Sequence, residues 1–186
     1  PNLRMSVNGK LDLDSISNLF TEIDLKGSLS YRTNLKGPLD KLEADFHFAG
    51  NEVEAPGLGA GNLVIKGKST LERISLEKIV WTQNTEKKLI ASLQANLNAP
   101  LDSLKVNLEL STIKLSTLYP IFGIEPPYPF ETTLSGTLKT DPISKQKQHR
   151  TTVALNLNTP TTISSNGEHI ITIPPTAISG ALNWSQ

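Results

Sequence analysis

The chain has 186 residues, and its 18 Lys and Arg balance its 18 Asp and Glu. A net charge near zero argues against nucleic acid as a partner, because neutralising phosphates requires a basic face. The sequence has no Cys, which excludes disulfides and thiolate metal sites. It also has no apolar run long enough to cross a bilayer as a helix.

The first regular pattern is a short helical signal at residues 11–20, "LDLDSISNLF". Its apolar residues stand at the first, third, sixth and ninth positions, and Asp14 is placed as an N-cap. Residues 113–122, "IKLSTLYPIF", repeat this spacing 102 residues later, with Ser116 as the cap and Pro120 limiting the helix. We therefore predict one or two short helices: one after Asp14, and a second after Ser116 if Pro120 allows a full turn to form.

Alternation of apolar and polar residues begins after the first helical signal. Residues 22–32, "EIDLKGSLSYR", put Ile, Leu, Gly, Leu and Tyr on one face and charged or small polar residues on the other. The same period of two recurs at 42–48, 89–99, 104–110, 130–138, 153–157 and 178–184. Such alternation predicts an antiparallel sheet with one apolar face, and the turn signals between the segments indicate about eleven to thirteen strands.

The sequence also repeats itself. "NLKGPLDKLEADFHF" at 34–48 returns 62 residues later as "NLNAPLDSLKVNLEL" at 96–110, and an "LxGxL" strand follows each helical signal. Because periods of this kind mark arrays rather than closed globules, we interpret 11–112 and 113–186 as two approximate units. The chain starts at Pro1 with neither an initiator Met nor a signal peptide, so we expect 1–186 to be a single fragment of a larger array.

No motif points to catalysis or to a metal. "GLGAG" at 57–61 lacks the strand–turn–helix context of a nucleotide loop and is expected to be a turn or a bulge. His47, His149 and His169 are too scattered for metal ligands, and no set of Ser, His and Asp resembles a nucleophile with its base. We predict no enzymatic activity, no metal and no cofactor. Residues 139–150, "KTDPISKQKQHR", are expected to form a solvated loop or a basic contact with lipid headgroups or an anionic partner.

The phrase "IDLKGSLSYRTNLKGPLDKL" resembles the TamB and AsmA-like family of large bacterial envelope proteins. Their periplasmic regions repeat Leu-x-Gly-x-Leu followed by a Gly and a Pro-x-Leu. The matching residues here are Leu25, Gly27, Leu29, Leu35, Gly37, Pro38 and Leu39 and, less fully, Leu97, Pro100, Leu134, Gly136 and Leu138. Ala99 departs from the pattern, because it stands where the family phrase has Gly.

The resemblance implies an all-β fold, in which a long, twisted antiparallel sheet curls into an open, taco-like groove with an apolar inside. It also implies a parent protein that is anchored in the inner membrane and crosses the periplasm. The implied function is to carry phospholipid, or other apolar cargo, between the inner and outer membranes. A second implied function is to assist outer-membrane protein assembly together with an outer-membrane β-barrel partner.

A groove for acyl chains needs apolar side chains on one strand face and no buried charge. The residues that we predict to line it are Leu25, Leu29, Phe46, Phe48, Leu93, Leu97, Val106, Leu108, Leu134 and Leu155. Two alternatives remain open: an assembly scaffold or chaperone that pairs with strands of its clients, and an ordinary β-sandwich whose core is the apolar stripe. Residues 177–184 are expected to form an unprotected sheet edge through which the fragment associates.

Overall fold

The computed structural model describes residues 2–15, 25–55, 59–117, 132–143, 148–158, 161–165 and 168–185. The described strands are β1 (Asn2–Asp12), β2 (Ser28–Pro38), β3 (Glu43–Ala55), β4 (Gly59–Thr70), β5 (Arg73–Gln83), β6 (Glu86–Asn96), β7 (Lys105–Lys114), β8 (Thr133–Ile143), β9 (Gln148–Leu157), β10 (Thr161–Ser165), β11 (Glu168–Ile173) and β12 (Thr176–Ser185). Two short 3-10 helices are η1 (Leu39–Lys41) and η2 (Leu115–Thr117). None of the helices in the described ranges has the length and apolarity to cross a membrane.

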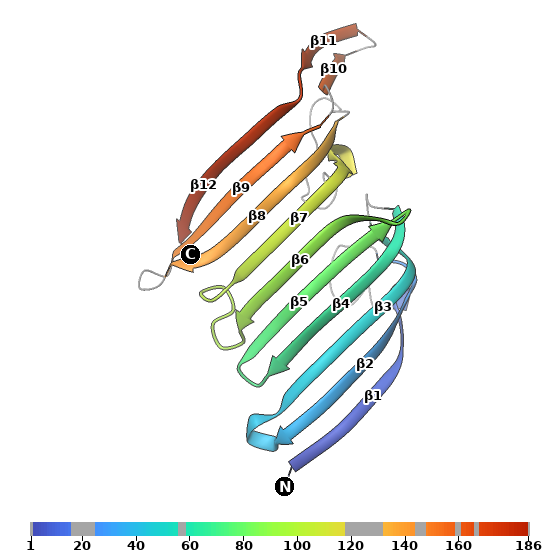
Figure 1. The fold of residues 1–186 in the computed structure, drawn as a ribbon, viewed down its shortest axis with the longest axis vertical. Helices are drawn as coiled ribbons and strands as arrows, with labels where there is room; N and C mark the ends of the chain where they lie inside the picture. The colour runs from blue at the N-terminus through green and yellow to red at the C-terminus, as the bar shows by residue number, and fades with distance from the viewer. Residues whose placement is uncertain are drawn as a thin grey trace.

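Ten of the strands form one antiparallel sheet, in the order β1-β2-β3-β4-β5-β6-β7-β8-β9-β12. The strands β10 and β11 form a separate hairpin, after which β12 returns to pair with β9. Figure 1 shows the ten strands side by side along the long axis of the molecule, with β1 at one end and β12 at the other. The sheet is not closed, and the prediction of an all-β antiparallel fold is confirmed.

Turn chemistry explains where the chain reverses. Asn84 and Thr85 join β5 to β6 with φ angles of 47° and 68°, as the two left-handed residues of a type I′ turn require. Thr70 stabilises the turn between β4 and β5, because its hydroxyl accepts hydrogen bonds from the N–H groups of Glu72 and Arg73 at 3.3 and 3.1 Å. The two repeated phrases occupy equivalent places, since each forms the end of one strand, a turn and the next strand.

The pairing register sorts the side chains onto two faces, because residues directly opposite each other in neighbouring strands share a face. Phe48 of β3 lies opposite both Tyr31 of β2 and Ile65 of β4. His47, the next residue along β3, lies opposite Arg32 and Lys66. We call the side that carries Phe48 the apolar face and the side that carries His47 the polar face.

Three β-bulges keep apolar residues on the apolar face after the alternation changes phase. In β3 the register shifts between Gly50 and Val53, in β5 between Leu76 and Ile79, and in β7 between Leu110 and Ile113. Each bulge sets two residues of its strand against one of the neighbouring strand, which moves the apolar set from even to odd positions or the reverse. As a result Val53, Ile79 and Ile113 join the same face as the apolar residues before the bulges.

The most enclosed part of the molecule lies at one end of the first strands. Leu13, Leu29, Val53 and Trp81 form a buried cluster, and Leu11, Leu25, Phe48, Leu63 and Leu89 pack against it. Gly61 makes room for the indole, because a Cβ at this position would stand 2.6 Å from the Nε1 atom of Trp81. Elsewhere each strand contacts chiefly its hydrogen-bonded neighbours, so the described strands form a single layer.

The predicted helices differ from the structure in their caps. Residues 13–15 are helical, and the capping group is Asp12, not Asp14: its carboxylate accepts hydrogen bonds from the Asp14 N–H at 3.3 Å and the Ser15 hydroxyl at 2.9 Å. Asp14 instead accepts the Gly27 N–H at 3.2 Å and ties this turn to the start of β2. Ser116 lies within the short helix η2 rather than before it. The rest of the first predicted helix, and Pro120, lie outside the described residues.

The expectation of a loop at 139–150 is wrong for most of that segment. The strand β8 continues to Ile143 and β9 begins at Gln148, with Lys139 lying opposite Thr152 and Pro142 opposite His149. Residues 144–147 lie outside the described part of the chain. Threonines at 140, 151 and 152 favour the extended conformation here and outweigh the charged and turn-forming residues on which the loop prediction depended.

Candidate functional site

The residues predicted to line a groove can now be placed on the sheet. The register puts eight of the ten on the apolar face: Leu29, Phe46, Phe48, Leu93, Val106, Leu108, Leu134 and Leu155. Leu25 precedes β2 and packs against the buried cluster. Leu97 lies beyond the end of β6, in a turn, and is 47% exposed. Most of the residues predicted to line a groove therefore lie on one face of the sheet, and Leu97 lies at the margin of that face.

Apolar side chains form rows that cross the sheet perpendicular to the strands. One row crosses all ten strands through Gly9, Tyr31, Phe48, Ile65, Ile79, Ala91, Leu108, Leu138, Val153 and Gly180. A second crosses them through Val7, Thr33, Phe46, Gly67, Leu76, Leu93, Val106, Thr140, Thr151 and Leu182. Neither row contains a charged residue. With about 4.8 Å between strands, each row is about 43 Å long.

Side chains in the middle of the apolar face are half-buried rather than enclosed. Phe46, Leu93, Val106 and Leu108 all fall in this intermediate range, although each has apolar neighbours on both sides. Leu134 is only 5% exposed, beside the bulge of β7. Within the described ranges no second sheet covers this face, so apolar surface stays open along most of its length.

Aromatic rings lie on the apolar face of the first strands. The rings of Phe46 and Phe48 meet edge to face with centroids 5.8 Å apart, and Tyr31 lies 6.1 Å from Phe48. Gly67 lies beneath Phe46, since a Cβ there would stand 2.6 Å from its ring. A side chain at position 67 would collide with the Phe46 ring, so Gly67 allows this ring to lie close to the backbone of β4.

His149 is the residue that the sequence placed least well. It was expected in the loop at 139–150, but it lies in β9 on the apolar face, is 0% exposed and stacks on Trp184 with ring centroids 4.5 Å apart. Neither of its ring nitrogens has a hydrogen-bond partner. The Trp184 indole N–H donates to the Thr151 hydroxyl at 2.9 Å, and that hydroxyl lies 3.0 Å from the Thr140 hydroxyl. The only sequence signal was the alternation through "HRTTVALNL".

Several acids on the polar face are paired with lysines. Lys36 lies 3.4 Å from both Asp45 and Glu43, and these carboxylates, Asp45 foremost, raise the pKa of Lys36. Glu77, at 2.9 Å, raises the pKa of Lys68. Within the described ranges no group of three or more His, Cys, Asp and Glu side chains is arranged to hold a metal ion.

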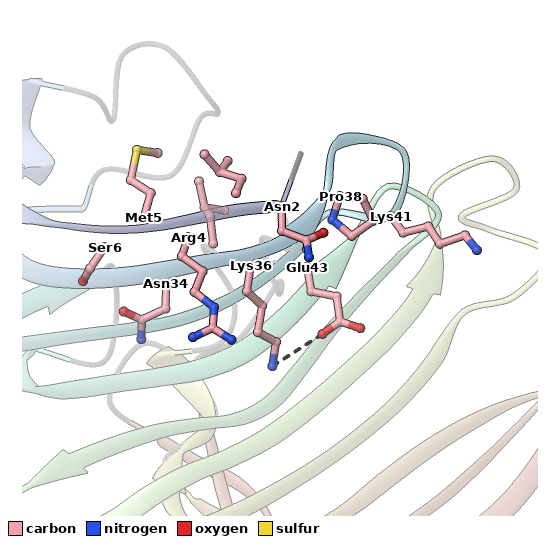
Figure 2. Close-up of a pocket in the computed structure, with 12 residues that line it drawn as sticks. Asn2, Arg4, Met5, Ser6, Asn34, Lys36, Pro38, Lys41 and Glu43 are labelled. Atoms are coloured by element: carbon pink, nitrogen blue, oxygen red, sulfur yellow. Dashed lines mark ion pairs between the residues drawn. The ribbon is translucent and has the colours of Figure 1, made fainter.

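Figure 2 shows a depression of about 800 Å³ at the free end of β1 and β2. Arg4, Lys36 and Glu43 project on one side of these strands, with the Lys36–Glu43 ion pair between them, whereas Met5 projects on the other. Leu3 and Leu35 also line the depression. The apolar face thus ends at this edge beside charged side chains, as expected for a surface whose rim meets water.

Comparison of the chain with protein-family models, with curated proteins and with solved structures finds no match.

Proposed function

We propose that this chain is a segment of a periplasm-spanning hydrophobic β-groove that carries phospholipid between the inner and outer membranes. In this proposal the open sheet curls along its long axis, with the apolar face inside, and the parent protein is anchored in the inner membrane. The function is transport rather than catalysis. It would support the lipid balance of the outer membrane.

The observation that carries the proposal is the apolar face, which runs across all ten strands and whose central side chains are half-buried rather than enclosed. Acyl chains gain free energy wherever they remove such surface from water, at about 25 cal/mol per Å². A charged side chain in the path would have to be desolvated by each passing lipid, and the two ten-strand rows contain none. Leu, Val and Phe side chains distinguish apolar from polar groups but not one acyl chain from another, so the groove would accept many acyl chains.

The sheet's single layer distinguishes this proposal from the sandwich alternative. A sandwich buries its inner faces between two packed sheets. The described strands form one layer, and side chains such as Phe46 and Leu108 keep part of their surface exposed. This arrangement favours an occupant other than a second sheet of the same domain.

Site-specific photo-cross-linking tests the proposal in bacteria that direct the chain to the periplasm. A photoreactive amino acid in place of Leu108 would project from the apolar face, whereas the same group in place of the neighbouring Asn107 would project from the polar face. We expect phospholipid adducts, identified by mass spectrometry, from position 108 and not from 107. Equal labelling at both positions, or none at 108 in folded protein, would contradict lipid carriage.

A second candidate function is a scaffold for the assembly of outer-membrane β-barrel proteins. The observation that favours it is the edge of β12, which pairs with β9 and with no other strand in the described part of the chain. Unpaired backbone groups at such an edge can hydrogen-bond an incoming client strand. Cross-links to β-barrel proteins from β12, without lipid adducts at position 108, would support this function instead.

A further inference from the structure

Four basic side chains lie in one line across the polar face. Arg32 of β2 is directly opposite His47 of β3, His47 is opposite Lys66 of β4, and Lys66 is opposite Lys78 of β5. All four are exposed. We call this line the basic row. Lys66 and Lys78 are directly opposite each other, and like charges so placed destabilise a sheet, so the folded chain alone does not account for the row.

Among the described residues, none of the four side chains in the basic row forms an ion pair with an acid, although acids lie nearby. Ion pairs are formed instead by other lysines, among them Lys36, Lys68, Lys88 and Lys139. In β3, Asp45 is two residues from His47 and binds Lys36, while Glu77 adjoins Lys78 in β5 and binds Lys68. The neighbouring positions are therefore neutralised, and the row keeps its charge.

A depression on the same part of the sheet supports a ligand for this charge. It has a volume of about 570 Å³, and its lining includes Lys10, Arg32 and His47 together with the polar groups of Asn8 and Ser30. No acidic residue lines it. Lys10 of β1 thus extends the positive region to the edge of the sheet.

We propose that the basic row docks the polar face onto an anionic membrane surface, through the phosphate groups of lipid headgroups. The row spans three strand spacings, about 14 Å, which suits an array of negative groups better than a single small anion. It runs across the strands, whereas an added acidic β-strand would run along them. It contains no Phe, Tyr or Trp side chain, and the sequence pI of about 7.4 is far below that of typical nucleic-acid-binding domains.

This inference does not depend on the proposed cargo, because the basic row and the apolar face lie on opposite sides of the sheet. Docking through the polar face would leave the apolar face free. Each Lys or Arg near an anionic bilayer strengthens binding about fivefold.

Vesicle co-sedimentation of the full chain tests the docking surface. We expect binding to vesicles of phosphatidylcholine and phosphatidylglycerol at low salt, and little binding to phosphatidylcholine alone. The variant K66Q/K78Q should bind about 25-fold more weakly, since two contributions are lost. The control K41Q/K105Q changes the net charge equally at exposed positions outside the row, and should lose less than about threefold.

Circular dichroism of both variants checks that they fold, which we expect because no paired charge is removed. Equal weakening by the two variants would overturn the assignment, since binding would then follow net charge alone. Equal binding to both kinds of vesicle, or to neither, would overturn it as well. A parallel calorimetric titration uses inorganic phosphate at constant ionic strength. Phosphate binding without binding to anionic vesicles would overturn the membrane assignment in favour of a soluble anion.

Discussion

His149 of β9 stacks face to face on Trp184 of β12, with ring centroids 4.5 Å apart and ring planes inclined by 17°. This contact joins the last strand of the sheet to β9, its one neighbour among the described strands. The indole N–H, which donates to Thr151, adds a hydrogen bond between the same two strands. Trp184 therefore covers the buried imidazole of His149 and holds β12 against β9.

Trp184→Ala removes the stack, the hydrogen bond and the cover of His149. We expect it to lower the free energy of unfolding by about 2 kcal/mol, which is less than a fully buried Trp would cost. Urea unfolding measures the change. Asn183→Ala, on the polar face of the same strand, is the control and should shift stability by less than about 0.5 kcal/mol. Equal effects of the two substitutions would mean that the stack does not hold β12 in place.

Gly61→Ala tests the close approach of the backbone to Trp81. The new Cβ would stand 2.6 Å from Nε1 and 2.7 Å from Cε2 of the indole, so the buried ring must move. We expect a loss of about 1–3 kcal/mol in the free energy of unfolding, together with a changed Trp fluorescence spectrum. Gly180→Ala is the matched control, because a Cβ there meets nothing within 4 Å. A neutral Gly61→Ala would show that the indole is not packed against this strand.

Leu108→Asp places a carboxylate in the middle of the apolar face. Because Leu108 is only half-buried, we expect the chain to fold, with an unchanged far-ultraviolet circular dichroism spectrum. The phospholipid that co-purifies should fall about tenfold or more, since each acyl chain would have to desolvate the charge. Native mass spectrometry provides the measurement, and Asn107→Asp on the polar face provides the control. A normal amount of co-purified phospholipid in folded Leu108→Asp protein would argue against lipid binding on the apolar face.

The edge strand β12 predicts concentration-dependent association. Ile178 and Leu182 are 53% and 65% exposed there, and the strand contains neither Lys nor Pro to protect its free edge. Light scattering across a concentration series should show reversible oligomers. Gly180→Lys adds an edge charge without a steric conflict and should shift the chain to monomer. A strictly monomeric unmodified chain at high concentration would contradict an adhesive edge.

Lys66→Gln and Lys68→Gln should change stability in opposite directions. Lys66 lies directly opposite Lys78, so neutralising Lys66 relieves the repulsion between them and should raise the free energy of unfolding by about 0.2–0.5 kcal/mol at low salt. Lys68 is bound to Glu77, and its replacement removes an attraction at the surface. Urea unfolding at low and high salt measures both, and the difference between the variants should shrink as salt screens the charges. Equal shifts would mean that the basic row carries no repulsion.

The sequence alone determined that the chain forms antiparallel strands with one apolar and one polar face. Alternation is a local property, because successive side chains of a strand point to opposite sides whatever the strand pairs with. For this reason Phe46, Phe48, Val106 and Leu108 could be assigned to one face from the letters. The turn phrases likewise marked the hairpins before Glu43 and Lys105, since Pro fixes its own φ angle and Gly allows the positive φ angles of turns.

The tertiary structure decided what depends on a neighbour. A bulge exists only relative to a partner strand, so the inclusion of Val53, Ile79 and Ile113 in the apolar face could not follow from strict alternation. Which strand stands at the edge depends on β12 pairing with β9 across the β10–β11 hairpin. The burial of His149 and the alignment of the basic row have the same cause, because both require side chains from several strands to meet in register.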